Sequence, residues 1–213
     1  MNDKCIGLVL RLRPLKDTSL IVHWLTPEYG RFATTAKGAR RAKSPFRGKL
    51  DLLFEANIAF RRSRHTDLHT LTEVNLVELH PAVRKDVAKL RLMAYATRFL
   101  EQTTETETPL LGIHAILTTL LDHLDCAATR PALVYALEMK LLNELGLAPA
   151  LNESLLNDST IQLLEQLAIR NWEGITELKP EKSQVKAMKE FLHGFLIHNL
   201  GTLPRGRDAV LAT

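Results

Sequence analysis

Residues 20–36 read LIVHWLTPEYGRFATTA, and this stretch decides the fold of the first third of the chain. Residues 20–25 and 31–36 are rich in the apolar, aromatic and β-branched side chains that favour strands. The TPEYG segment between them is typical of a turn, because Pro27 sets its own φ and Gly30 can adopt a positive φ. We therefore predict two neighbouring strands joined by a short turn.

Three further segments within the first 80 residues alternate apolar and polar side chains with the period of a half-buried strand. They are residues 6–13, 50–61 and 68–79. In the second of them, one face carries Leu52, Phe54, Ala56, Ile58 and Phe60. Five short strands in a segment of this length predict a small barrel of the OB type. A small β-sandwich is the alternative.

After Pro81 the apolar residues follow helical spacing. We predict helices over 82–101, 109–124, 131–145, 160–170 and 181–200. Because the strands come first and the helices follow, two separate domains are expected, of residues 1–80 and 81–213. The fold class is thus α+β and multidomain, with an OB-type barrel preceding an all-α domain. The polar tail from residue 204 is expected to be mobile.

The net charge of +4 is unevenly distributed along the chain. Residues 1–80 carry 14 Lys and Arg against 8 Asp and Glu, whereas the remainder carries 14 against 16. The densest run is residues 37–49 (KGARRAKSPFRGK), which has no acidic residue. Such a run can contact phosphates, and a phenylalanine within it can stack on a base. The predicted nucleic-acid contacts in this run are Lys37, Arg40, Arg41, Lys43, Phe46, Arg47 and Lys49.

Two smaller basic clusters accompany this run. Arg11 and Arg13 end the first strand, and Arg61, Arg62 and Arg64 follow the fourth. In a small barrel these clusters could line one groove with residues 37–49, so we add them to the predicted interface. Scattered surface charge is the alternative.

Residue types that carry chemistry are sparse. Cys5 and Cys126 form no metal set and suit a reducing cytoplasm, and the eight histidines lack zinc-ligand spacing. Phosphate-binding, dinucleotide-binding and nucleophile-elbow motifs are absent from the sequence. We therefore expect a non-enzymatic protein without metal or cofactor. The rival functions are an RNA- or ribosome-binding OB protein, a basic protein–protein adaptor and a nuclease.

Residues 17–50 (DTSLIVHWLTPEYGRFATTAKGARRAKSPFRGKL) resemble the N-terminal signature of the RecO DNA-repair family. That signature reads approximately ETSLIV…FT…GR…AKGARR.KS…G.L, and it brings Arg31 into the predicted interface. Leu71-Thr72-Glu73 resembles a later motif, so the likeness covers residues 8–78. In the helical part, Leu137-Glu138, Leu141-Leu142 and Leu145-Gly146 resemble the family's "E..LL..LG" helix.

The resemblance implies a cytoplasmic, nucleoid-associated bacterial recombination mediator. Such a protein binds single- and double-stranded DNA and anneals complementary strands. With a RecR-type partner it helps to load recombinase onto DNA coated by single-strand-binding protein. Many relatives carry a four-cysteine zinc module after the "LG" helix, but residues 147–164 contain neither Cys nor His. We accordingly expect no zinc module.

The resemblance also implies a docking site for the acidic C-terminal tail of single-strand-binding protein, which ends in an aromatic residue. An apolar groove between helices 131–145 and 181–200, with a few cations at its rim, would suit this tail. The predicted groove residues are Leu137, Leu141, Leu142, Phe191 and Phe195, and the rim residues are Arg130, Lys140, Lys186 and Lys189. Ordinary core packing is the competing interpretation of these apolar side chains.

Overall fold

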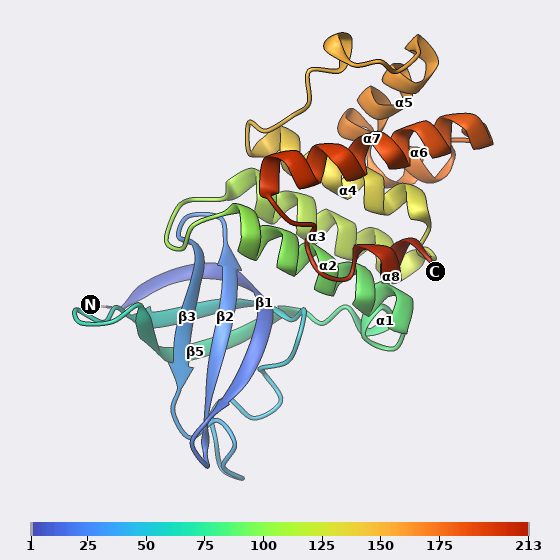
Figure 1. The fold of residues 1–213 in the computed structure, drawn as a ribbon. Coiled ribbons are helices and arrows are strands. Elements are labelled where there is room, and N and C mark those ends of the chain that lie inside the picture. The colour runs from blue at the N-terminus through green and yellow to red at the C-terminus, as the bar shows by residue number, and fades with distance from the viewer. Residues whose placement is uncertain (1, 213) are drawn as a thin grey trace. The chain divides into compact units, whose positions relative to one another are not determined.

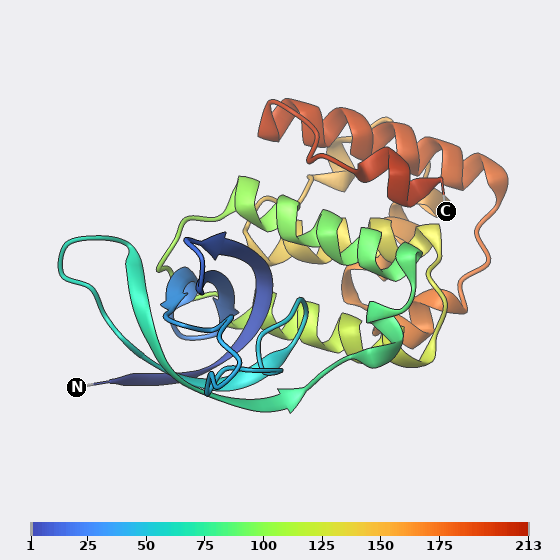
Figure 2. The same cartoon turned by 90° about the horizontal axis from the view of Figure 1, so that it is seen from below.

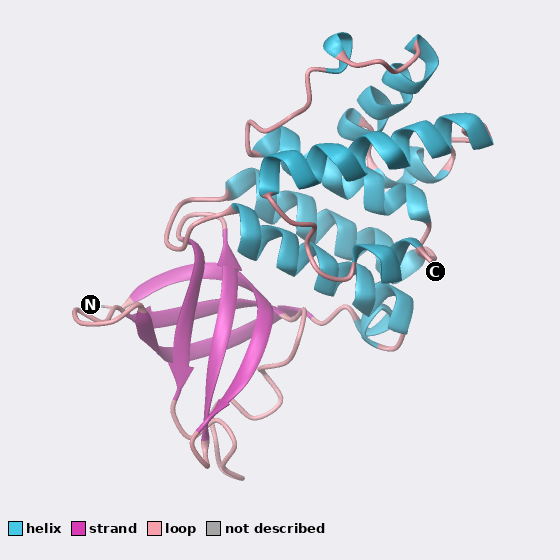
Figure 3. Cartoon of the chain, in the orientation of Figure 1, coloured by secondary structure: helices cyan, strands magenta, loops and turns pink. Residues whose placement is uncertain are grey.

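The computed structural model describes residues 2–212, in which the strands precede the helices (Figures 1 and 3). The strands are β1 (Asp3–Leu15), β2 (Ser19–Thr26), β3 (Gly30–Ala36), β4 (Glu55–Arg61) and β5 (Leu68–Glu78). They close into a barrel in the order β1-β2-β3-β5-β4, and only the β3–β5 pair is parallel. The predicted five-stranded OB-type barrel is confirmed, and the sandwich is excluded.

Aromatic and aliphatic side chains from all five strands fill the barrel. Trp24 is fully buried, and its indole Nε1–H donates to Thr34 Oγ1 at 2.8 Å, so the polar atom of this large side chain is satisfied. Phe32 and Phe60 pack with ring centroids 4.6 Å apart. The longest strand, β1, curves around the barrel (Figure 2), and its pairing with β2 shifts register between Val9 and Arg11.

The predicted turn between β2 and β3 is confirmed. Gly30 has φ of 62°, and a Cβ at this position would lie only 1.7 Å from the carbonyl oxygen of Thr108. Thr26 Oγ1 donates to the Gly30 carbonyl at 3.0 Å and accepts the Tyr29 N–H at 3.2 Å. Both the backbone conformation and the close approach of another segment therefore require glycine here.

The predicted start of the fourth strand is wrong. β4 begins at Glu55, and the chain forms a turn at Leu52 and Leu53. Leu53 has φ of 63°, which interrupts the alternation and leaves Leu52 41% exposed. The Leu53 N–H donates to the Val9 carbonyl and the Val9 N–H to the Phe54 carbonyl, both at 2.9 Å. Residues 53 and 54 are therefore hydrogen-bonded to β1 but lie outside the regular β1–β4 ladder.

The described residues after β5 contain eight α-helices. They are α1 (Pro81–Arg84), α2 (Val87–Thr103), α3 (Leu111–Cys126), α4 (Pro131–Glu144), α5 (Asp158–Ile169), α6 (Trp172–Thr176), α7 (Lys182–Leu200) and α8 (Arg207–Leu211). The chain forms two compact units. The first joins Thr104–Thr118 to the barrel, and the second comprises Lys85–Thr103 and the chain from Thr119 onward.

The expectation of a mobile tail is wrong, because α8 is anchored by a buried ion pair. Arg207 is 1% exposed, and its Nε lies 2.7 Å from Oε1 of the fully buried Glu138 on α4. A second bond joins Arg207 to Glu138 Oε2 at 2.8 Å, and the Tyr95 hydroxyl donates to Oε1 at 2.6 Å. Burial and the neighbouring carboxylate raise the pKa of Tyr95, so its hydroxyl stays protonated and remains a donor.

Candidate nucleic-acid interface

Residues 37–49 form an ordered loop after β3. The Gly38 N–H donates to Ser19 Oγ at 3.2 Å and the Arg40 N–H to the Thr18 carbonyl at 2.9 Å, which fixes the loop to the β1–β2 turn. Within the loop, the N–H groups of Arg41, Ser44, Arg47 and Lys49 each donate to the carbonyl three residues earlier, at 3.0 to 3.2 Å. These successive turns hold the basic side chains on a defined backbone, which lowers the entropic cost of binding.

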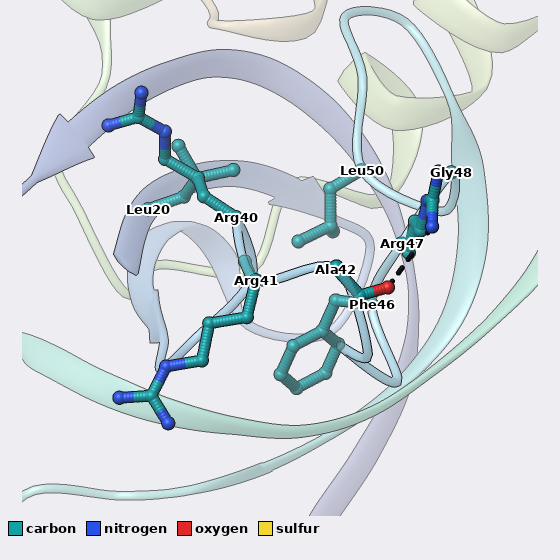
Figure 4. A pocket seen from close by; sticks show the side chains of 9 residues that line it. Leu20, Arg40, Arg41, Ala42, Phe46, Arg47, Gly48 and Leu50 are labelled. Carbon is teal, nitrogen blue, oxygen red and sulfur yellow. Dashed lines mark hydrogen bonds between the residues drawn. The ribbon is translucent and has the colours of Figure 1, made fainter. Parts of the chain in front are cut away.

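Five cations of this loop are exposed, namely Lys37, Arg40, Arg41, Lys43 and Arg47. Arg47 donates from one guanidinium nitrogen to the Ala42 carbonyl at 3.1 Å, which leaves its other N–H donors available (Figure 4). The loop itself contains no carboxylate that would neutralise this group. The arrangement can contact several phosphates of one nucleic-acid strand.

Two predicted contacts of the loop have different surroundings. Phe46 is 6% exposed and belongs to the barrel core, so its predicted role as an exposed stacking platform is wrong: its ring anchors the loop. Lys49 is half-buried, and its Nζ donates to the Val74 carbonyl on β5 at 3.0 Å. Both side chains therefore attach the loop to the barrel.

A second basic group lies at the other end of β3. Arg31 donates from Nε to Thr104 Oγ1 at 2.6 Å and also bonds to the Thr104 carbonyl. Arg62 pairs with Asp3 at 2.8 Å and lies over the Tyr29 ring at 5.0 Å. Because β3 is seven residues long, roughly 20 Å separates its two ends.

The predicted single groove is therefore not formed. Arg61 ends β4, and Arg64 lies in the segment between β4 and β5. Both are exposed, at the end of the barrel away from the loop. Arg13 pairs with Ile21 and lies at the loop end of the barrel, whereas Arg11 is half-buried opposite His23. The exposed charge concentrates on residues 37–49, and Arg13 extends it along β1.

Acidic partners reduce the charge of the second group. His69 is buried, its Nε2 lies 3.1 Å from Glu107 Oε1, and its Nδ1 accepts the Ser63 N–H at 3.4 Å. Glu107 also lies 3.9 Å from Arg62. Two carboxylates thus partly neutralise Arg62, and this end of the barrel is a weaker anion site than the loop with its five exposed cations.

In the helical unit, the prediction that three leucines line a peptide groove is wrong. Leu137, Leu141 and Leu142 are all fully buried, so they belong to the core and are unavailable to a peptide. Two predicted rim cations are engaged: Lys140 Nζ donates to the carbonyls of Ala168 and Arg170, and Arg130 donates to the Thr176 carbonyl. Burial lowers the pKa of Lys140 from its usual value. These groups stabilise the fold.

An apolar groove is present at a different place, along α7. Phe191 and Phe195 are half-buried and stack with centroids 6.1 Å apart. Leu155 is fully exposed and lines the same groove of about 520 Å³, together with Leu156, Ala187, Glu190, Gly194 and His198. Lys186 and Lys189 are exposed on α7. Phe191 and Phe195 were among the groove residues predicted for the tail-docking site, but Leu155 lies in an irregular segment that no periodicity marks.

Sequence reasoning also missed an apolar hollow beside the basic loop. Leu50 directly follows the basic run in the sequence, and Leu20 on β2 pairs with Ala36, the residue before the run. In the structure these two leucines line a hollow of about 330 Å³ with arginines around it. Leu50 at the end of the run was the available signal, whereas the approach of Leu20 depends on the pairing of β2 with β3.

The described residues contain two free cysteines, the half-buried Cys5 and the exposed Cys126. Burial raises the pKa of the Cys5 thiol to about 12, so this thiol is a poor nucleophile at neutral pH. Residues 2–212 hold no group of three or more His, Cys, Asp or Glu side chains arranged for a metal ion. Within the same residues, no helix combines the length and hydropathy that a membrane crossing requires.

Comparison with known proteins gives matches along most of the chain. Family models for the N- and C-terminal parts of recombination protein O match residues 1–80 and 84–156. The DNA repair protein RecO of Anaeromyxobacter sp. (strain K) is 30% identical over 149 residues, which cover 70% of this chain and 59% of that protein. RecO of Exiguobacterium sibiricum is 31% identical over 155 residues, covering 71% and 60% respectively. RecO of Bacillus pumilus is 28% identical over 153 residues, covering 72% and 59%. Each match spans less than two thirds of the relative's length.

Proposed function

This chain belongs to the RecO family, and from that premise we propose that it binds DNA through residues 37–49 and anneals complementary strands in recombinational repair. The observation that carries the proposal is the ordered loop with five exposed cations and no acid. Annealing needs no covalent step, which agrees with a non-enzymatic role. A cationic surface that holds two polyanions together lowers their repulsion and raises their local concentration.

The loop favours contacts to the nucleic-acid backbone over base-specific contacts. Arginine and lysine bind phosphates irrespective of sequence, so we expect little sequence preference and a steep dependence on salt. An annealing protein must accept any pair of complementary strands, and this form of recognition suits it. Arg13 extends the same surface, whereas Arg31 and Arg62 are held by their own partners.

We propose a mediator role for the chain in the bacterial cytoplasm, on the nucleoid. There it would act with a RecR-type partner and load recombinase onto strands coated by single-strand-binding protein. The acidic tail of that protein, with its terminal aromatic residue, would enter the groove of Phe191 and Phe195, with Lys186 and Lys189 nearby. This groove replaces the one predicted between residues 131–145 and 181–200. The division into a DNA-binding domain, 1–80, and a partner-binding domain, 81–213, remains part of the proposal.

Fluorescence anisotropy with a labelled single-stranded DNA tests the binding proposal. We expect tight binding at low salt that weakens steeply as salt rises, and weaker competition from RNA of the same length. Stronger competition by RNA would indicate the RNA-binding alternative. Binding to acidic peptides without binding to DNA would indicate the adaptor.

A labelled tail peptide tests the groove on the full chain. Phe195→Ser should weaken peptide binding and leave the affinity for DNA unchanged. The matched control is His193→Ser, an exposed position on the same helix outside the groove. Equal peptide binding by both variants and the parent chain would contradict this docking site.

A further inference from the structure

The hollow beside the basic loop has an apolar interior and a cationic rim. Its volume of about 330 Å³ lies at the lower end of the range for small-ligand sites. Leu20 from β2 and Leu50 after the loop line it, with the edge of the buried Phe46 ring. In Figure 4 the Leu50 side chain points into the space, whereas the guanidinium groups of Arg40 and Arg41 point outward in different directions.

The rim is held open by the loop's own hydrogen bonds. Arg47 is fixed across the loop by its bond to the Ala42 carbonyl at 3.1 Å, and the Arg40 N–H is tied to the Thr18 carbonyl. The Phe46 ring is buried in the barrel core and holds the loop against the barrel. The hollow is thus largely formed before any ligand arrives.

Two chemical properties of the hollow restrict its occupant. The half-buried side chains of Leu20 and Leu50 favour a flat apolar group and offer little to a free hydrated anion. Its three exposed arginines favour anionic groups beside that flat group, and a guanidinium plane can also stack on an aromatic ring. A nucleobase flanked by its two backbone phosphates combines both properties.

We propose that this hollow receives one unpaired base of a single DNA strand, while Arg40, Arg41 and Arg47 contact the phosphates on either side. The proposal rests on the DNA-binding function proposed above and adds a base site to it. A paired base is enclosed in the duplex stack and cannot enter, so the site favours single strands. Every base has an aromatic face, so the site tolerates any sequence.

An abasic oligonucleotide separates base insertion from phosphate binding. Two single strands of equal length are compared at the same salt, one intact and one with abasic residues throughout, so that the phosphate count is identical. Base stacking on protein side chains predicts that the intact strand binds about five- to tenfold more tightly. An internal 2-aminopurine should also become brighter on binding, because insertion removes it from its neighbours in the stack.

A substitution that fills the hollow supplies the matched test. Ala42 is exposed and lines the hollow, so Ala42→Leu occupies space without changing charge. It should remove the preference for the intact strand and the 2-aminopurine response, while the salt dependence stays the same. The control Ala128→Leu, at an exposed position in the helical unit, should retain both.

The outcomes distinguish this proposal from the function on which it rests. Equal binding of intact and abasic strands by the parent chain, with no 2-aminopurine response, overturns the base site but leaves phosphate binding intact. Failure of the parent chain to bind either strand overturns the proposed DNA-binding function itself. An unchanged preference in a folded Ala42→Leu variant places base contacts elsewhere and also overturns the proposal.

Discussion

Reversing the charge of Arg40 and Arg41 should weaken DNA binding through the loss of phosphate contacts. Both side chains are exposed, and their backbone amides, which hold the loop, are unchanged by Arg40→Glu and Arg41→Glu. We therefore expect the double variant to fold as the parent chain does. Its unfolding temperature checks this condition before binding is measured.

The magnitude follows from the number of exposed cations on the loop. If each of the five neutralises one phosphate, the slope of log K against log salt is about −3.5 on single strands. Removing two contacts reduces the slope to about −2 and weakens binding about 25-fold near 0.1 M salt. The two added carboxylates repel the strand, so this value is a lower limit.

The assay is anisotropy of a labelled single strand at several salt concentrations, with several unrelated sequences. All sequences should weaken by the same factor, because phosphate contacts carry no sequence information. The matched control is Lys179→Glu with Lys182→Glu, exposed lysines of the helical unit that change net charge equally. If both double variants lose the same affinity, net charge and not the loop governs binding, and the reasoning is refuted.

Four further results are expected. At pH 8 a thiol reagent should label Cys126 rapidly, because this side chain is exposed. Cys5 should react only after unfolding, because burial raises the pKa of its thiol to about 12. Rapid labelling of two thiols in the folded chain would contradict this. Arg207→Met leaves the Glu138 carboxylate buried without its partner, so denaturant unfolding should show a loss of about 3–5 kcal/mol; a loss below about 1 kcal/mol would mean that the pair is not buried in solution. Phe46→Ala removes a core ring and should lower the free energy of unfolding by about 3–5 kcal/mol, as thermal or denaturant melts can measure. Elemental analysis of pure protein should find no stoichiometric zinc. One equivalent of zinc per chain would contradict the expectation that the chain lacks a zinc module.

The barrel was predictable because strand alternation and turn chemistry are local. Residues 20–36 contain two strands and the Gly30 turn within one short stretch, and the structure reproduces them. The start of β4 was not predictable, since the positive φ of Leu53 depends on hydrogen bonds to Val9, more than 40 residues earlier. Alternation alone cannot show where one residue reverses the pattern.

The helical unit shows the limit of periodicity. The spacing of Leu137 and Leu141 predicts an apolar stripe correctly but does not say whether another element covers it. Arg207 was placed in a mobile tail because its partner Glu138 lies 69 residues earlier. A glutamate within the apolar sequence of α4 was the available sign that a cation must be buried beside it.

The candidate site was predictable in its charge but not in its geometry. The composition of residues 37–49 identified the basic loop. The division of roles, in which Phe46 and Lys49 support the loop while their neighbours face solvent, depends on contacts with the barrel. Similarly, Arg31 and Arg62 resemble the loop arginines in sequence, but the structure pairs them with Thr104 and Asp3.

Strand annealing tests the central claim most directly. Two complementary labelled strands, each coated with single-strand-binding protein, are mixed with the parent chain or the Arg40→Glu and Arg41→Glu variant, and duplex formation is followed by energy transfer between the labels. The account predicts that the parent chain accelerates annealing and that the variant loses most of this acceleration. Equal acceleration by both proteins, or none by the parent chain under conditions where it binds DNA, would contradict it.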